Sequence, residues 1–331
     1  MKTRNRFIAL LLAALFCMAT PICASSVTAT SAGVQADYIR HIKETPISRF
    51  WGEAVVRGSL PTVDGFANTA LEQALNAKIS AAYTALLTKA GETARTIDLS
   101  YRIIADANYV SLLLNCKSTS TFSQESYSCI VFSPKTGKIL TITDVLGPNG
   151  TRLANGIIAT AVKAEPKKFN ATIKEITNTH DFYMENSVLY LVFDQFEIAP
   201  GAEGVVRIPV VLSNVTNLTV PKKDYYLSSL SRFGVKMIPI RLVAEAFGYE
   251  VLWNSSQSTV EVRKGGTYIS SFRINENSYY VGRNTRRRLE TAPELLNNRT
   301  HVPISFFEDI LGILYYTDAN GNIQFTAYAA K

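Results

Sequence analysis

An internal repeat constrains the fold of this chain more than any other feature. The first copy spans residues 237–253 and the second spans residues 301–316. In each copy a proline opens an apolar pattern of helical spacing and a glycine closes it. These residues are Pro239 and Gly248 in the first copy, and Pro303 and Gly312 in the second. Proline suits a first helical turn, and glycine takes the positive φ that ends many helices. The repeat therefore predicts two strand–helix–strand units.

The apolar positions predict which face of each helix is buried. They recur three and four residues apart, which forms one stripe along a helix. The stripe is Leu242, Val243, Ala246 and Phe247 in the first copy. It is Phe306, Phe307, Ile310 and Leu311 in the second. After the first helix, Val251 and Trp253 alternate with polar residues and indicate a strand.

The first 24 residues have the pattern of a cleaved export signal. Three basic residues precede an apolar run at 7–19, and Ala24 supplies a small residue before the expected cut. The basic residues are Lys2, Arg4 and Arg6. We expect cleavage after Ala24 and a secreted, cell-surface or periplasmic protein, with uncleaved anchoring as the alternative. The sequence around Cys17 and Cys23 fits a lipoprotein signal poorly.

Length and charge narrow the class of protein. The 331 residues suffice for about two domains. The formal net charge of +7 falls to +4 when the three basic residues of the signal are removed, because the signal contains no acidic residue. This excess is too small for us to expect nucleic-acid binding. After residue 25 we expect no membrane span, because no segment is long and apolar enough.

Two cysteines remain in the predicted mature chain. Cys116 and Cys129 lie symmetrically about residues 122–123, between the apolar segments 109–114 and 127–132. A hairpin centred there would place them opposite each other in an oxidising compartment. We therefore predict a cross-strand disulfide, whose stabilisation for so short a loop is about 3 kcal/mol. The absence of C-x-x-C spacing disfavours a redox-active pair.

The first half of the mature chain reads as α+β with a mainly antiparallel sheet. Amphipathic patterns predict long helices at about 71–87, with Gly91 past its end, and at about 151–164. The predicted strands are more numerous and lie at 96–104, 109–114, 127–132, 188–193 and 205–212. Residues 25–37 are rich in Ser, Thr, Ala and Gly and predict a flexible linker. The complete prediction is an α+β domain with two long helices, followed by a smaller α+β domain built from the two repeats.

Several short segments of the first domain carry a family resemblance. They are Leu60 to Gly65, Leu75 to Ile79, Thr136 to Leu140, Asp144 to Leu146 and Phe196 to Gly204. In this order and spacing, residues 38–220 resemble the extracellular domain of RsiV-type anti-sigma factors. The same region precedes the catalytic domain of a peptidoglycan deacetylase. In the anti-sigma factor it senses lysozyme, so the resemblance implies a protein-binding role.

The repeat carries a second resemblance. The matching segments are Ile238 to Gly248, Val251 to Asn254 and Asn298 to Pro303. Residues 225–331 are similar to the copper amine oxidase N-terminal, or stalk, domain, a common appendage on exported bacterial proteins. The second copy departs from that pattern at Ser305, where arginine is usual, and at Thr317, where tryptophan is usual.

Catalytic patterns are missing from the sequence. The three histidines, His41, His180 and His301, fall one per region, whereas a zinc or copper centre needs them clustered. There is no G-x-S-x-G elbow and no phosphate-binding loop. We therefore expect no enzyme activity, no metal and no cofactor.

Two features indicate candidate binding surfaces. The basic residues Arg283, Arg286, Arg287 and Arg288 form a cluster between the repeats. It is either a solvated charged turn or a contact for an anionic wall polymer or an acidic protein. The tyrosine pairs 225–226, 279–280 and 315–316 either alternate into the core or supply rings to a sugar or protein interface.

Three functions remain open. The first is an exported, non-catalytic binding protein of the cell envelope that recognises a protein such as lysozyme. The alternative is a module that binds peptidoglycan or an anionic wall polymer. The further alternative is an unrecognised cell-wall hydrolase.

Overall fold

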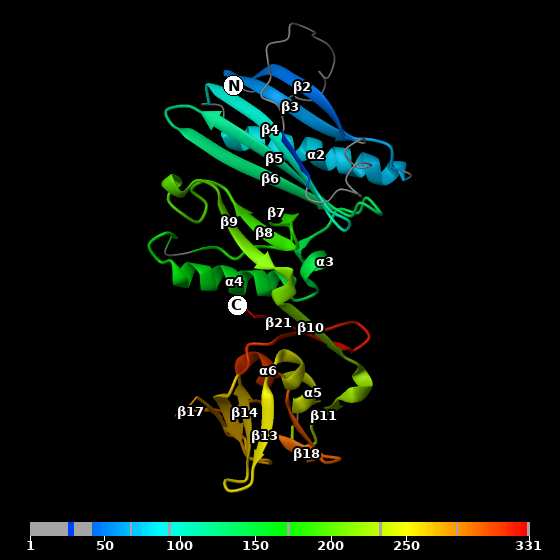
Figure 1. Cartoon of the computed structure of the whole chain (residues 1–331), viewed down its shortest axis with the longest axis vertical. Helices are drawn as coiled ribbons and strands as arrows, with labels where there is room; N and C mark the ends of the chain where they lie inside the picture. Colours follow the sequence, from blue (N-terminus) through cyan, green and yellow to red (C-terminus); the bar gives the residue numbers. More distant parts are fainter. Residues whose placement is uncertain are drawn as a thin grey trace, which may run out of the picture.

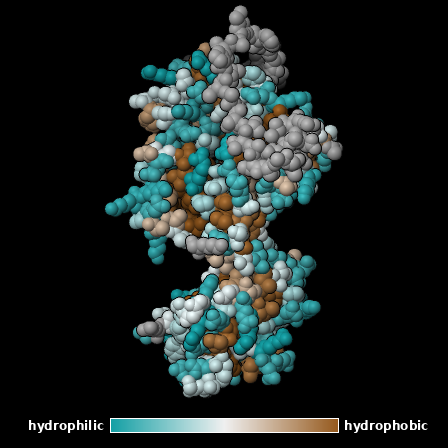
Figure 2. Space-filling view, in the orientation of Figure 1, coloured by the Kyte–Doolittle hydropathy of each residue, from teal (hydrophilic) through white to brown (hydrophobic). Residues whose placement is uncertain are grey.

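The computed structural model describes residues 26–29, 42–66, 68–91, 94–170, 173–231, 234–282 and 284–329. The predicted export signal, His41 and Arg283 lie outside the described residues. The molecule is elongated, and a narrow waist separates a larger N-terminal part from a smaller C-terminal domain (Figures 1 and 2).

A twisted sheet and one long helix form the outer half of the N-terminal part (Figure 1). The sheet order is β2-β3-β4-β5-β6, and only the β3–β4 pairing in this path is parallel. The strands are β2 (Ile42–Trp51), β3 (Ala54–Val63), β4 (Thr96–Ala105), β5 (Val110–Thr119) and β6 (Ser123–Phe132). A further strand, β1 (Ser26–Ala29), pairs in parallel with β4. The flexible-linker prediction is therefore wrong for these four residues, because they pair with residues 102–105 of β4, beyond the part that β3 covers.

Helix α2 (Thr69–Ala90) covers one face of this sheet. It begins after Asn68, whose side-chain oxygen accepts hydrogen bonds from the Ala70 and Leu71 N–H groups. It ends at Gly91, whose φ is 78°. Both signals are local, and the predicted helix is confirmed. The buried residues are Leu75, Ile79, Ala82, Tyr83, Leu86 and Leu87.

A second sheet lies against the other face of the first. It contains β7 (Phe182–Glu185), β8 (Val188–Phe193) and β9 (Val206–Val211) in that order. Tyr190 and Val192 of β8 point to the first sheet. The alternate residues Leu189, Leu191 and Phe193 join a separate core with α3 (Ile142–Leu146) and α4 (Gly150–Ala164). Because side chains alternate between the two faces of a strand, β8 contributes to both hydrophobic cores. The layers follow the order α2, first sheet, second sheet, α4.

The repeat forms the two predicted strand–helix–strand units. The first is β12 (Lys236–Pro239), α5 (Ile240–Ala244) with η4 (Glu245–Phe247), and β13 (Glu250–Asn254). The second is β19 (Arg299–Pro303), α6 (Ser305–Asp309) and β20 (Leu314–Thr317). Gly248 and Gly312 have φ values of 76° and 68°. Strands β12 and β19 pair antiparallel, so the two copies meet at their first strands.

The predicted stripe of the first repeat helix is wrong at two positions. Leu242 and Ala246 are exposed, and Ile240 and Ala244 are buried in their place. The predicted and the observed residues both fit helical spacing. The helix packs against β19 with the face that contains Ile240 and Ala244. In the other copy Phe306, Phe307 and Leu311 are buried as predicted, whereas Ile310 is half-buried. Phe306 is buried although its counterpart Leu242 is not, because it packs in T-shaped contact with Phe272 and Phe307.

The remaining strands complete an α+β fold of mainly antiparallel sheets, as predicted. One sheet has the order β13-β14-β15-β16-β17 and another the order β11-β12-β19-β18. Their other members are β14 (Thr259–Lys264), β15 (Thr267–Phe272), β16 (Tyr279–Val281), β17 (Thr285–Arg287), β11 (Tyr226–Leu227) and β18 (Glu294–Leu296). Within the described residues, no helix has the length and apolarity that a bilayer crossing requires.

The waist is itself hydrogen-bonded. Strand β10 (Val215–Val220), which leaves the N-terminal part, pairs with β21 (Ile323–Tyr328), and β21 pairs with β20. The buried Asn149 donates from Nδ2 to the Gln324 carbonyl at 3.2 Å and to the Thr326 hydroxyl at 3.3 Å. Arg152 of α4 donates to the Tyr315 carbonyl at 3.2 Å and pairs with Glu308. The two parts therefore share polar contacts at the waist.

The structure contradicts the predicted disulfide. Cys116 and Cys129 are free, and the ladder sets Cys116 opposite Ser126 and Cys129 opposite Leu113. The turn lies at residues 120–122, so the hairpin is centred earlier than expected. An odd offset in register puts two side chains on opposite faces of a sheet. Cys116 accordingly lies in the core beneath α2, and Cys129 lies on the face toward the second sheet.

Candidate functional site

Side chains that flank β7 and β8 of the second sheet cover the free edge of the first sheet. Strand β6 is an edge strand, and three alternate N–H groups along it have no partner among the described strands. They belong to Glu125, Tyr127 and Cys129. Their acceptors are Gln195 Oε1 at 3.0 Å, Asp194 Oδ1 at 2.6 Å and Asp181 Oδ1 at 2.5 Å, respectively. These three side chains therefore act as edge caps, which satisfy the donors and block pairing with another strand.

The edge caps also explain the perturbed acids of this region. Burial raises the pKa of Asp181 to about 6, although the hydrogen bond from the Cys129 N–H partly opposes the shift. Burial likewise raises the pKa of Glu197, whose carboxylate accepts the Asp194 N–H at 2.8 Å. Asp194 is also paired with Lys89 at the end of α2. Each carboxylate has a structural partner, so its environment does not require a catalytic role.

The edge caps fix the loop that follows β8. Gln195 donates from Nε2 to the Gly201 carbonyl at 2.8 Å, and its Oε1 accepts the hydrogen bond from the Glu125 N–H of β6. The Gln195 N–H donates to the Glu125 carbonyl at 3.3 Å, and the Asn170 N–H donates to the Ile198 carbonyl at 2.9 Å. The loop from 194 to 201 is thereby closed on itself and tied to the hairpin of β5 and β6.

An exposed aromatic pair stands at the junction of this loop and that hairpin. Phe122, from the hairpin turn, is 62% exposed, and Phe196, from the loop, is 50% exposed. Their ring centroids are 6.1 Å apart in a T-shaped arrangement. We call this pair the aromatic corner. It is held by the edge caps, because they bring residue 196 beside the hairpin.

The backbone of the aromatic corner is strained. Phe196 has a φ of 72°, a region that bulky residues rarely occupy. A Cβ on Gly201 would lie 2.0 Å from the Phe196 ring, so only glycine leaves room for the ring where it is. Strained residues and exposed aromatic rings are both features of binding sites. No sequence pattern indicated the strain, although Phe196 stands in a segment that carries the family resemblance.

The predicted arginine cluster lies in the C-terminal domain. Arg286 and Arg287 belong to the edge strand β17, Arg288 follows it, and all three are exposed. Arg283 lies outside the described residues. Arg286 donates to the Ser278 hydroxyl from Nε at 3.0 Å and from Nη2 at 2.7 Å, and Arg287 donates to the Asp309 carbonyl at 3.1 Å. This surface is on a different domain from the aromatic corner.

The tyrosine pairs divide between core and surface. Tyr279 is fully buried and Tyr280 is 45% exposed, as strand alternation requires. Tyr316 is exposed and Tyr315 is half-buried, whereas Tyr225 and Tyr226 are both half-buried. Of the pair 279–280, Tyr279 therefore packs in the core. Tyr280 lies on the surface, opposite Arg286 in the strand ladder.

The described histidines are structural in their contacts. His180 packs on the Phe193 ring at a centroid distance of 4.6 Å, and His301 is buried with Nδ1 2.9 Å from the Arg299 carbonyl oxygen. Burial lowers the pKa of both. In the part of the chain that the structure describes, no three His, Cys, Asp or Glu residues are grouped to hold a metal ion.

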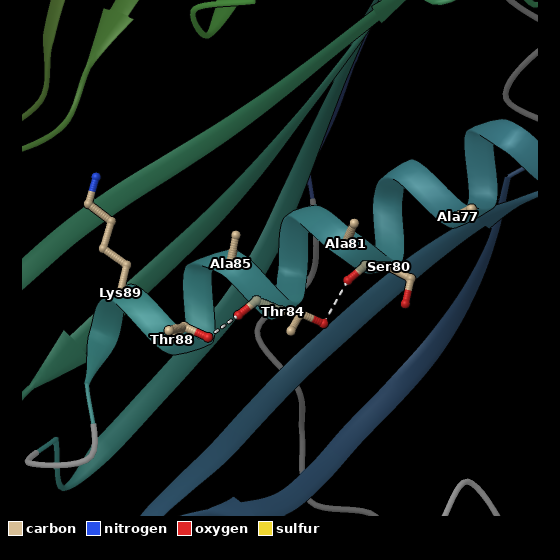
Figure 3. Close-up of a pocket in the computed structure, with 7 residues that line it drawn as sticks. All are labelled: Ala77, Ser80, Ala81, Thr84, Ala85, Thr88 and Lys89. Atoms are coloured by element: carbon tan, nitrogen blue, oxygen red, sulfur yellow. Dashed lines mark hydrogen bonds between the residues drawn. The ribbon is translucent and has the colours of Figure 1, made fainter. Parts of the chain in front are cut away.

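A shallow depression lies along the outer face of α2 (Figure 3). It is lined by Ala77, Ser80, Ala81, Thr84, Ala85, Thr88 and Lys89. The Thr84 and Thr88 hydroxyls donate to carbonyl oxygens one turn earlier, at 3.0 Å and 2.9 Å. The face therefore presents mainly methyl groups, and no contact among the described residues indicates an occupant.

Comparisons with known proteins match two separate segments of the chain. Residues 229–324 match the copper amine oxidase N-terminal domain, and residues 145–213 match DUF3298, a family of unknown function. The first match confirms the expected stalk resemblance, and the second falls inside the region that resembles the envelope sensor. A "Protease inhibitor" of Brevibacillus choshinensis is 36% identical over 75 residues, which is 23% of this chain and 22% of that protein. The chain thus spans less than a quarter of this relative.

Two solved structures of DUF3298 proteins are also similar. One, from Bacteroides fragilis, is 11% identical with a TM-score of 0.37 and covers 52% of this chain and 91% of that chain. The other, from Pseudomonas aeruginosa, is 13% identical with a TM-score of 0.34 and covers 52% and 88%. By its two family matches, the chain joins a segment similar to DUF3298 to a C-terminal domain that matches the copper amine oxidase N-terminal domain.

Proposed function

We propose that this chain is an exported, non-catalytic binding protein of the cell envelope whose ligand is a protein, with lysozyme as the first candidate. The aromatic corner is the proposed contact surface. The observation that carries the proposal is Phe196, a half-exposed aromatic residue held at a φ of 72° beside the exposed Phe122.

The physical argument is preorganisation. A protein ligand would bury both rings, and aromatic side chains contribute much of the binding energy in such contacts. Ordering a loop on binding opposes association, but here the edge caps already hold the loop. The affinity would therefore arise from a surface that needs little rearrangement.

Two similarities support a protein ligand. The Brevibacillus relative is named a protease inhibitor, and an inhibitor of that kind acts on a protein. Separately, the resemblance of residues 38–220 to the envelope sensor implies lysozyme recognition. The proposal of a non-catalytic role rests on the edge caps, which give the perturbed carboxylates structural partners.

The test is a calorimetric titration of residues 25–331 with lysozyme. We expect saturable binding, and we expect Phe122→Ala to weaken it about tenfold or more, which corresponds to about 1.4 kcal/mol. Trp253→Ala is the matched control, because Trp253 is a similarly exposed aromatic residue of the other domain, at 57%. It should leave the titration unchanged. No heat from the wild type, or equal losses from the two variants, would remove the proposal.

A parallel pull-down with peptidoglycan separates the wall-binding alternative. Retention on peptidoglycan without lysozyme heat would favour a wall-binding module. A turnover assay on wall fragments addresses the hydrolase alternative, for which we expect no product.

A further inference from the structure

The edge strand β17 of the C-terminal domain carries positive charge, and no described acidic residue forms an ion pair with it. Arg286, Arg287 and Arg288 are consecutive and exposed on or next to β17. None of them takes part in an ion pair with another described residue. The partners recorded for Arg286 and Arg287 are neutral oxygens, the Ser278 hydroxyl and the Asp309 carbonyl.

The arginines are nevertheless held in place. Ser278 is buried, and its hydroxyl accepts from Nε and Nη2 of Arg286. A guanidinium has five N–H donors, so three remain on its terminal nitrogens for a ligand. Beyond Arg288, Asn277 binds Leu289 through both amide atoms, accepting its N–H at 3.1 Å and donating to its carbonyl at 2.8 Å. The chain on either side of Arg288 is thus anchored alongside β16.

The spacing suits a ligand with repeated charges. Arg288 directly follows β17, and the Asn277–Leu289 hydrogen bonds continue the pairing with the neighbouring chain past it. Since alternate residues of an extended chain lie on one face about 6.5 Å apart, we infer that Arg286 and Arg288 share a face. Tyr280, 45% exposed, is directly opposite Arg286 in the ladder. The strand pair therefore presents two guanidinium groups and one aromatic ring to the same side.

Two acids near the cluster have other partners. Glu261 lies on the same outer face three strands away, roughly 14 Å, and Arg263 neutralises it at 2.9 Å. Glu290, two residues beyond Arg288, accepts the Ser305 hydroxyl instead of an arginine. Among the described residues, no carboxylate holds the guanidinium groups of the cluster, which leaves them available to an anion.

We propose that Arg286, Arg288 and Tyr280 form a second binding site, which takes an extended polyanion with regularly repeated oxyanion groups. Guanidinium forks bind phosphate and carboxylate in the same geometry, and the tyrosine ring supplies a flat apolar face beside them. One charge would be enough to prevent edge-to-edge pairing of β17, so protection of the edge does not account for three. The site is independent of the aromatic corner, since it belongs to the other domain.

The test measures fluorescence anisotropy with two labelled probes, a glycerol-phosphate oligomer and a poly-glutamate of equal charge. Residues 25–331 should bind at least one probe, with affinity that falls as salt rises. Arg286→Gln with Arg288→Gln should weaken binding about tenfold. Arg299→Gln with Lys223→Gln removes the same charge from exposed positions outside the cluster and should weaken binding little. Preference between the probes identifies phosphate or carboxylate as the recognised group.

Two further variants separate geometry from charge. Arg286→Lys with Arg288→Lys keeps the charge but loses the planar fork, so its affinity should fall between wild type and the glutamine variant. Ser278→Ala frees the Arg286 guanidinium and should weaken binding without changing net charge. Equal losses from the two glutamine pairs, or no binding of either probe by the wild type, would overturn the proposal. Lysozyme titration of the same variants should be unchanged, which keeps this test separate from that of the aromatic corner.

Discussion

At the level of single residues, Phe196 and Gly201 depend on each other. Gly201 is the position where an added Cβ would meet the Phe196 ring at 2.0 Å, and real Cβ atoms do not approach so closely. The pair shows how a small residue permits a strained large one. It is also the point at which the aromatic corner is most easily damaged.

Gly201→Ala should therefore displace the Phe196 ring. We expect lysozyme affinity to fall about tenfold or more, with a stability loss of about 1–3 kcal/mol from overpacking. A crystal structure of the variant would locate the ring. Gly156→Ala is the control, because nothing lies within 4 Å of its added Cβ. An unmoved ring with unchanged affinity would show that Gly201 does not shape the corner.

Asp181 should make stability depend on pH. Burial raises its pKa to about 6 in the folded protein from an ordinary value of 3.8. The carboxyl therefore ionises more easily in the unfolded chain, and the free energy of unfolding falls as pH rises from about 4 through about 6. The largest contribution is about 3 kcal/mol. Glu197, whose pKa is also raised, acts in the same direction.

The comparison of wild type with Asp181→Asn isolates this effect. Urea unfolding at several pH values between about 4 and about 7.5, the range on either side of the folded pKa, should show a smaller fall in stability for the variant. Burial lowers the pKa of His180 and opposes the trend, but it acts equally in both proteins. The pKa of Asp144, lowered to about 2 by its hydrogen bonds with Lys138 and Thr141, matters only at more acidic pH. Parallel pH curves for the two proteins would contradict the assignment.

At the level of strands and helices, the edge of β6 is the decisive feature. A strand edge that faced solvent would offer its N–H groups to any other strand, whereas here three side chains accept them. The same contacts hold the 194–201 loop. Stability and the shape of the candidate site thus depend on one set of hydrogen bonds.

Asp194→Ala should be strongly destabilising. It leaves the Tyr127 N–H without this acceptor and Lys89 without its carboxylate, and we expect a loss of about 2–3 kcal/mol. Lys89→Ala should lose less than about 1 kcal/mol, because the Lys89 side chain is 48% exposed. Denaturant unfolding of both variants gives the comparison. Similar small losses would mean that the edge cap contributes little.

For the molecule as a whole, the waist decides whether the two parts behave as one. Asn149 is buried there and joins the start of α4 to β21 through two hydrogen bonds. Asn149→Ala should separate the unfolding of the two parts. The two tryptophans report on them individually, since Trp51 lies in β2 and Trp253 in β13.

Single-tryptophan proteins make this measurable. With Trp253→Phe or Trp51→Phe, fluorescence follows one part at a time during urea unfolding. We expect the two transitions to coincide in these backgrounds and to separate once Asn149→Ala is added to each. Coincidence with and without that substitution would show that the remaining contacts of the waist, the β10–β21 ladder and the Arg152 contacts among them, suffice for coupling.

Signals carried by neighbouring residues were enough to predict many elements of the fold. Gly91 marks the end of α2, and Gly248 and Gly312 end the repeat helices, because a positive φ is decided within a few residues. Periodicity also identified α4 and the strands β4, β5, β6, β8 and β9. The stalk resemblance was visible for the same reason, since its pattern consists of such local signals.

Register and contacts between distant segments became visible only in the folded molecule. A turn centred earlier than symmetry suggests put Cys116 and Cys129 on opposite faces, and no local pattern encodes that shift. Likewise, the acceptors at 181, 194 and 195 meet β6 across more than 50 positions of sequence. The aromatic corner results from those contacts, because Phe122 and Phe196 become neighbours only after the second sheet has docked on the first.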